Sequence, residues 1–208
     1  MTIEQTPAFA RSDVRPTPAG TSSPTTRPFV RQGYLLTAGA LAWAAVTAVV
    51  GSTDPETATD EAIFSSGSGL FQLGLLGLLV VLFRTQALGG GKLARFFIRL
   101  EAVLLTLAIA STFVDGIGVS DLDQTGWVIL DMFWPISMLG MFMIGVRVAI
   151  AGRWSGVSRF WPLVAESWAV VVVPTMGIAG EGAATVVSCI HLTIGYAVLG
   201  QIVARKQG

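Results

Sequence analysis

The sequence has little charge, almost no lysine and a single cysteine. Charged residues make up 12% of its 208 residues, against about a quarter in an average globular domain, whereas hydrophobic residues reach 52%. The one cysteine, Cys189, excludes a disulfide within the chain. Because the formal net charge is zero, the composition offers no attraction to nucleic acid, and no nucleic-acid partner is expected. This composition is typical of a membrane protein.

Long apolar segments make up most of the chain. A helix needs about 20 mostly apolar residues to cross the hydrocarbon core of a bilayer. Six segments meet or nearly meet this length: 33–51, 66–83, 97–114, 127–149, 160–178 and 183–203. Their hydrophobicity is continuous rather than alternating, which favours helices over the strands of a membrane barrel. We predict an all-α, polytopic six-helix membrane bundle over residues 31–204, a disordered cytoplasmic tail over 1–30, and a short cytoplasmic tail over 205–208.

Positive charges are confined to alternate connections. All 13 Lys and Arg residues lie in the N-terminal tail, in or beside the second and fourth connections, and at the C-terminus. In the first, third and fifth connections, every charged residue is acidic. The positive-inside rule counts Lys and Arg in short loops, so both termini are expected in the cytoplasm. The expected partners are the lipid bilayer and either a second copy of the chain or another membrane protein.

Two carboxylates fall inside the predicted spans near their cytoplasmic ends. Glu101 and Glu166 each lie a few residues from the inner end of the third and fifth spans, close in depth to Arg147. An ionised group at the bilayer centre costs at least ~2.5–3.5 kcal/mol, so such groups need partners. We interpret this inner layer as carboxylate–arginine pairing, to which Arg84 and Arg99 also contribute. A proton or cation relay on the two carboxylates and independent snorkelling are the alternatives.

A second polar layer is expected nearer the outer ends of the helices. Asp131 and His191 lie one to two turns from the outer ends of the fourth and sixth spans. Gln72, Thr112 and Asp115 fall close to the same depth. Histidine titrates near neutrality, so a carboxylate opposite it would form a proton-coupled site. The alternative is a single interhelical hydrogen bond, which is worth only about 0.6 kcal/mol on average in a membrane.

Two prolines lie inside the predicted spans. Pro135 follows Asp131 on the fourth span, and Pro174 lies on the fifth. Each removes a hydrogen bond from its helix and is expected to kink it. Kinked helices beside polar residues form the central cavities of transporters, although kinks without transport are more common.

No enzyme motif, metal site or cofactor site is evident. The sequence has no P-loop, H-E-x-x-H, C-x-x-C or G-x-S-x-G pattern. The placement of Ser137 and His191 is similar to that in rhomboid intramembrane proteases, but Ser137 lies outside a G-x-S-G motif and the second span has no histidine. Four methionines on the fourth span do not share one face, and methionine commonly fills gaps between helices. We expect a protein without enzymatic activity, metal or cofactor, with an intramembrane hydrolase as the alternative.

One stretch of the sequence resembles a known group of proteins. The run Asp131–Gly140, together with Trp161-Pro162, Trp168 and His191, is similar to small uncharacterised six-helix integral membrane proteins of actinobacteria. The similarity covers the fourth to sixth spans. It implies a bacterial plasma membrane as the location and adds no activity.

Two functions are compatible with these features. The first is a membrane-embedded accessory or structural protein that acts through helix packing. The second is a small permease, or a proton- or ion-coupled transporter, with its site around Asp131 and His191. A hydrated cavity that reaches both residues would favour transport. Dry side chains that bond to one another would favour the accessory function.

Overall fold

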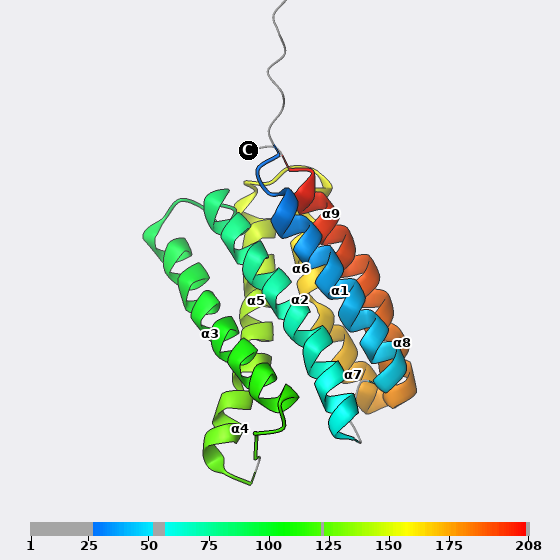
Figure 1. The fold of residues 1–208 in the computed structure, drawn as a ribbon. Coiled ribbons are helices and arrows are strands. Elements are labelled where there is room, and N and C mark those ends of the chain that lie inside the picture. The colour runs from blue at the N-terminus through cyan, green and yellow to red at the C-terminus, as the bar shows by residue number, and fades with distance from the viewer. Residues whose placement is uncertain (1–26, 52–56, 122, 207–208) are drawn as a thin grey trace, which may run out of the picture.

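The computed structural model describes residues 27–51, 57–121 and 123–206, and this part of the chain forms a helix bundle without strands (Figure 1). Six stretches are long and apolar enough to cross a membrane: Val30–Val50, Ala58–Arg84, Lys92–Gly116, Thr125–Ala151, Val157–Ala179 and Glu181–Ala204. The prediction of an all-α bundle with six spans is therefore confirmed. Most of the tail that we expect to be disordered lies outside the described residues.

The first three spans are continuous helices: α1 (Val30–Val50), α2 (Ala58–Arg84) and α3 (Lys92–Gly116). Both α2 and α3 start more than a turn before the apolar segments from which they were predicted, because polar residues extend each helix beyond its apolar part. At the start of α2, the Thr57 hydroxyl accepts a hydrogen bond of 3.1 Å from the backbone N–H of Asp60. Asp60 and Glu61 then place negative charge at the positive end of the helix dipole.

The last three spans are each interrupted. The fourth consists of α4 (Thr125–Asp131) and α5 (Phe133–Ala151), the fifth of α6 (Val157–Glu166) and α7 (Trp168–Ala179), and the sixth of α8 (Glu181–His191), the π-helical turn η1 (Leu192–Ala197) and α9 (Val198–Ala204). The break at Met132 lies three residues before Pro135, whose ring removes a helical hydrogen bond to the preceding turn. Pro174, by contrast, lies within α7, and the fifth span is interrupted at Ser167 instead.

An aromatic cluster joins five of the spans at the centre of the bundle. Trp43 on α1 is 3% exposed. Its ring centroid lies 4.8 Å from that of Phe71 on α2, 5.8 Å from that of Trp134 on α5 and 5.2 Å from that of Trp168 on α7. Phe71 extends the cluster to Tyr196 on η1, with 4.7 Å between the ring centroids. These large side chains fix how the first, second, fourth, fifth and sixth spans pack.

Small residues bring α1 and α9 into close contact. A Cβ atom added to Gly33 would overlap the backbone of Gly200 and Ala204, so the two helices approach closely only because this position lacks a side chain. The hydroxyl of Thr37 also donates a hydrogen bond of 3.1 Å to the carbonyl oxygen of Ala197. The first and last spans are therefore packed side by side, as Figure 1 shows.

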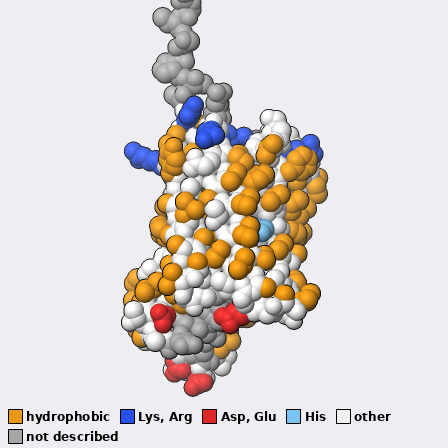
Figure 2. All heavy atoms as spheres, turned by 90° about the vertical axis from the view of Figure 1, so that its right-hand side faces the viewer, with side chains coloured by type: hydrophobic (Ala, Val, Ile, Leu, Met, Phe, Trp, Pro, Cys, Tyr) orange, Lys and Arg blue, Asp and Glu red, His pale blue; other side chains and the backbone are white. Residues whose placement is uncertain are grey.

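The charged residues gather at opposite ends of the bundle. On the face drawn in Figure 2, Lys and Arg lie at the upper end of the bundle, whereas Asp and Glu lie at the lower end. Hydrophobic side chains cover much of the surface between them. The bundle thus has a basic end, where α3 and α6 begin, and an acidic end, where α2 and α8 begin.

Candidate functional site

Glu101 on α3 is buried against α5. Its side chain is 3% exposed, and the hydroxyl of Ser137 donates a hydrogen bond of 2.5 Å to its Oε1 atom. A Cβ atom added to Gly140 would overlap Oε2, so the carboxyl group occupies space that Gly140 leaves open. Because α3 starts at Lys92, Glu101 lies nine residues inside the helix, or about 13.5 Å from its first residue. This is deeper than the sequence predicts.

Glu166 is buried between α6 and η1. It is the last residue of α6 and is 1% exposed. The hydroxyl of Tyr196 donates a hydrogen bond of 2.9 Å to its Oε2 atom, while Oε1 is buried and has no hydrogen-bond partner among the described residues. The neighbouring carbonyl oxygen of Gly195, in the same π-helical turn, accepts a hydrogen bond of 2.9 Å from the indole N–H of Trp161. The irregular turn therefore supplies two contacts to the fifth span.

Hydroxyl groups, and not arginines, bond to these two carboxyl groups. The hydrogen bonds of Glu101 and Glu166 in the described part of the chain come from Ser137 and Tyr196. Arg147 instead has an exposed side chain, and its guanidinium lies near the turn at Gly89. This corrects the expected arginine pairing. The pairing fails because the carboxyl groups lie too deep in the bundle. Each lies nine residues inside its helix, whereas Arg147 lies at the basic end.

Gln72 and Thr112, two members of the predicted outer layer, are joined directly. Gln72 on α2 is fully buried, and its Nε2 atom donates hydrogen bonds of 2.7 Å to the Thr112 hydroxyl on α3 and 3.2 Å to the Ser68 hydroxyl. Asp115 lies one turn beyond Thr112 on the same helix and is half-buried. The pair Gln72–Thr112 links the second and third spans.

Asp131 and His191 are not brought together. Asp131 is exposed at the end of α4, which packs against α3 and α5. His191 ends α8, which packs against α1, α7 and η1, and its Nε2 atom lies 3.0 Å from the carbonyl oxygen of Ala165. Figure 1 shows α4 and α8 on opposite sides of the bundle. Asp131 and His191 have a similar predicted depth in the membrane, but the order of the helices around the bundle keeps the two residues apart.

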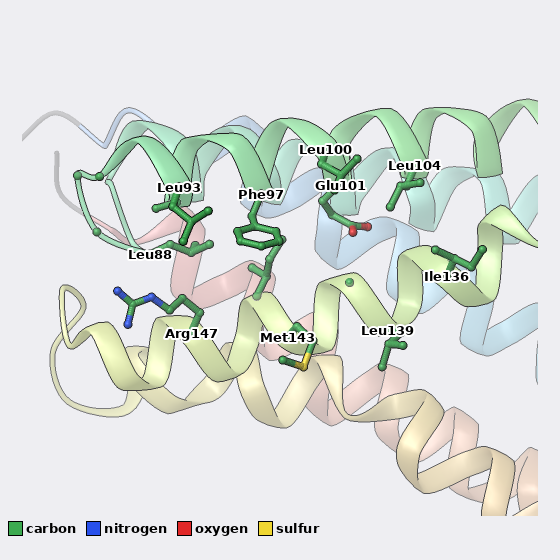
Figure 3. A pocket seen from close by; sticks show the side chains of 16 residues that line it. Leu88, Leu93, Phe97, Leu100, Glu101, Leu104, Ile136, Leu139, Met143 and Arg147 are labelled. Carbon is green, nitrogen blue, oxygen red and sulfur yellow. The ribbon is translucent and has the colours of Figure 1, made fainter.

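A groove of about 700 Å³ runs between α3 and α5 (Figure 3). We call it the α3–α5 groove. Glu101 lies on its inner wall, and Arg147 lies at one end beside the glycine turn 89–91. Neither Asp131 nor His191 lines it. Its other side chains are apolar: Leu88, Leu93, Ala94, Phe97, Leu100, Leu104, Ile136, Leu139, Met143 and Ile144.

Tyr196 and the α3–α5 groove were not predicted from the sequence. Tyr196 is one of only two tyrosines, and it lies well inside an apolar span. A buried tyrosine hydroxyl usually has a hydrogen-bond partner, so a tyrosine inside an apolar span indicates a polar contact between helices. The sequence indicates for Ser137 only a placement similar to that in rhomboid proteases, whereas its hydroxyl bonds to Glu101. The groove depends on which helices are neighbours, for which the sequence pattern carries no signal.

Comparisons with protein-family models, with curated proteins and with solved structures found no match.

Proposed function

We propose that the chain is a non-enzymatic accessory protein of the bacterial plasma membrane, which acts by packing and binding within the bilayer. The observation that supports this function is that its intramembrane polar side chains bond to one another across spans. Three such bonds are Gln72–Thr112, Glu101–Ser137 and Glu166–Tyr196. They join the second span to the third, the third to the fourth, and the fifth to the sixth. These bonds stabilise the arrangement of the helices.

Both termini are proposed to lie in the cytoplasm. The basic end carries the Lys and Arg residues of the alternate connections, and such residues are retained on the cytoplasmic side of a membrane. The partner of the protein is the bilayer itself, and a second copy or another membrane protein is the further candidate. Large apolar side chains that remain exposed along the spans, such as Ile178 (87%) and Phe113 (67%), fit contact with lipid or with such a partner.

The alternative is a small permease with a site around Asp131 and His191. Such a site requires water to reach His191, because a solute or proton has to enter and leave. The separation of α4 from α8 and the contact of His191 with the Ala165 carbonyl oxygen weigh against one shared site. The accessory function is therefore the better supported of the two.

Cysteine accessibility distinguishes these functions. In a Cys189→Ala background, we would introduce Gln72→Cys or His191→Cys and treat cells with a maleimide that does not cross membranes. The accessory function predicts no labelling of either cysteine, because both positions would be dry. Val119→Cys, on the exposed connection after α3, is the positive control. Labelling of His191→Cys as fast as Val119→Cys would favour the permease.

The same background tests the orientation. Val119 lies at the acidic end, whereas Ser155 lies on the exposed connection between α5 and α6 at the basic end. We expect Val119→Cys to be labelled in intact spheroplasts and Ser155→Cys only after the membrane is permeabilised. The reverse pattern would overturn the proposed orientation without affecting the accessory function.

A further inference from the structure

The walls of the α3–α5 groove have the length of one leaflet of a bilayer. Along α3 the groove extends from Leu93 to Leu104, and along α5 from Ile136 to Arg147. Each interval is eleven residues, which corresponds to about 16.5 Å of helix. Half of a hydrocarbon core of about 30 Å is nearly the same length. The groove therefore matches an acyl chain of the leaflet at the basic end.

The side chains along the walls are apolar and open to the lipid phase. Leu93 is 69% exposed, Leu139 61% and Met143 57%, although all three lie within spans. Phe97 lies between the two helices and points into the groove (Figure 3). Such a surface holds an extended hydrocarbon chain through contacts along its whole length.

The end of the groove at the basic end is suited to an anion. The exposed guanidinium of Arg147 lies there, with its Nη2 atom 3.8 Å from where a Cβ atom of Gly89 would be. The first turn of α3 begins beside it at Gly91 and has no side-chain cap, so its N–H groups face outward at the positive end of the helix dipole. A Cβ atom at Gly91 would meet nothing within 4 Å, which leaves room for a ligand.

We propose that the α3–α5 groove is a binding site for one anionic phospholipid of this leaflet. Its phosphate accepts hydrogen bonds from the Arg147 guanidinium and from N–H groups at the start of α3. One acyl chain lies along the groove and passes Glu101. The carboxyl of Glu101 is held by Ser137 on the inner wall, so the anionic group is favoured only at the arginine end. The site goes beyond the accessory function and does not require it.

The positive charge of Arg147 and the apolar walls together favour an anionic phospholipid over other ligands. A free phosphate ion would leave the apolar walls uncovered. A zwitterionic phospholipid has the same phosphate but no net charge, and its ammonium group offsets part of the attraction to Arg147. A helix of a partner protein would cover the walls and leave the guanidinium without an anion. An anionic phospholipid satisfies both the apolar walls and the positive end with one molecule.

Retention of lipid by the purified full-length protein tests the head-group contact. The protein would be delipidated in detergent, mixed with phosphatidylglycerol or phosphatidylcholine, and examined by native mass spectrometry. We expect one phosphatidylglycerol to be held at least about tenfold more tightly than phosphatidylcholine, and Arg147→Gln to remove this preference. Arg205→Gln, which changes an exposed arginine at the same end but directly after the sixth span, should retain the preference. The proposal would be overturned if both variants lost the preference for phosphatidylglycerol equally, or if inorganic phosphate displaced the lipid.

A second pair of variants tests the acyl chain. Leu139→Trp enlarges a side chain that lines the groove, whereas Ile150→Trp enlarges a side chain of the same helix outside it, and the two residues are 61% and 65% exposed. We expect the first to weaken phosphatidylglycerol binding several-fold and the second to leave it unchanged. Thermal unfolding of each variant establishes that it is folded. Unchanged binding by folded Leu139→Trp would show that the chain does not occupy the groove and would refute the site.

Discussion

The hydroxyl of Tyr196 lies 2.9 Å from Oε2 of Glu166, and both residues are found where their helices lose regular α-helical geometry. Glu166 is the last residue of α6, and Tyr196 lies in the π-helical turn of the sixth span. Both side chains are buried almost completely. The bond therefore connects the fifth and sixth spans at a point where the backbone of neither is continuous α-helix.

Removing the hydroxyl of Tyr196 should destabilise the bundle. In Tyr196→Phe the Oε2 atom of Glu166 loses the donor that it has in the structure, and the buried carboxyl is left with fewer partners. We expect the free energy of unfolding to fall by about 1–3 kcal/mol, measured by thermal unfolding in detergent. Tyr34→Phe is the matched control, since Tyr34 is 56% exposed. Equal stability of the two variants would contradict this role of Tyr196.

A methyl group at Gly140 should displace the Glu101 carboxyl. In Gly140→Ala the added Cβ atom overlaps Oε2 of Glu101. We therefore expect the free energy of unfolding, measured by thermal unfolding in detergent, to fall by about 1–3 kcal/mol. Gly177→Ala is the control, because a Cβ atom there meets nothing within 4 Å and alanine favours the helix by roughly 0.5–1 kcal/mol.

A double-mutant cycle shows whether Glu101 is the cause. If the overlap is with its carboxyl group, Gly140→Ala should cost less in a Glu101→Ala background than in the natural sequence. Equal costs in both backgrounds would assign the effect to another neighbour of Gly140.

The hydroxyl of Thr112 should contribute to contact between the second and third spans. Thr112→Val keeps the shape of the side chain but removes the acceptor of the 2.7 Å bond from Gln72. Hydrogen bonds between membrane helices contribute about 0.6 kcal/mol on average and at most about 1.7 kcal/mol. We expect the free energy of unfolding to fall by an amount in this range. In the control, Thr106→Val, the lost bond goes only to Ala102 of the same helix, so a smaller change in unfolding temperature is expected. A larger loss in the control would refute the prediction.

Close contact between α1 and α9 should not tolerate a side chain at Gly200. A Cβ atom there overlaps Thr37 and the backbone oxygen of Gly33, so Gly200→Ala forces the helices apart. We expect a loss of about 1–3 kcal/mol in the free energy of unfolding. Gly126→Ala on α4 has open space around it, so it should not lower stability and, like Gly177→Ala, favours the helix by roughly 0.5–1 kcal/mol. Similar unfolding temperatures for both variants would show that α1 and α9 separate without cost.

The sequence predicted the spans better than their ends. All six apolar segments correspond to membrane-length helices, because hydrophobicity over about 20 residues is a property of the local sequence. The apolar pattern predicts a start near residue 97 for the third span, whereas α3 begins at Lys92, since a charged first turn does not interrupt a helix. The shorter predicted span puts Glu101 closer to the basic end, and at that depth an arginine partner is expected. The sequence predicts kinks at Pro135 and Pro174, whereas the spans are interrupted at Met132, three residues before Pro135, and at Ser167, seven residues before Pro174.

By itself, the sequence determined the number of spans and the separation of charge along them, because both follow from which residues are adjacent in the chain. Only the tertiary structure decided which polar groups meet. Asp131 and His191 were expected to share a layer but lie on helices with different neighbours, while Glu166 bonds to Tyr196. A span can turn any face toward any neighbour at little cost in hydrophobicity. Contacts between specific residues, such as the fit of Glu101 against Gly140, therefore decide the order of the helices.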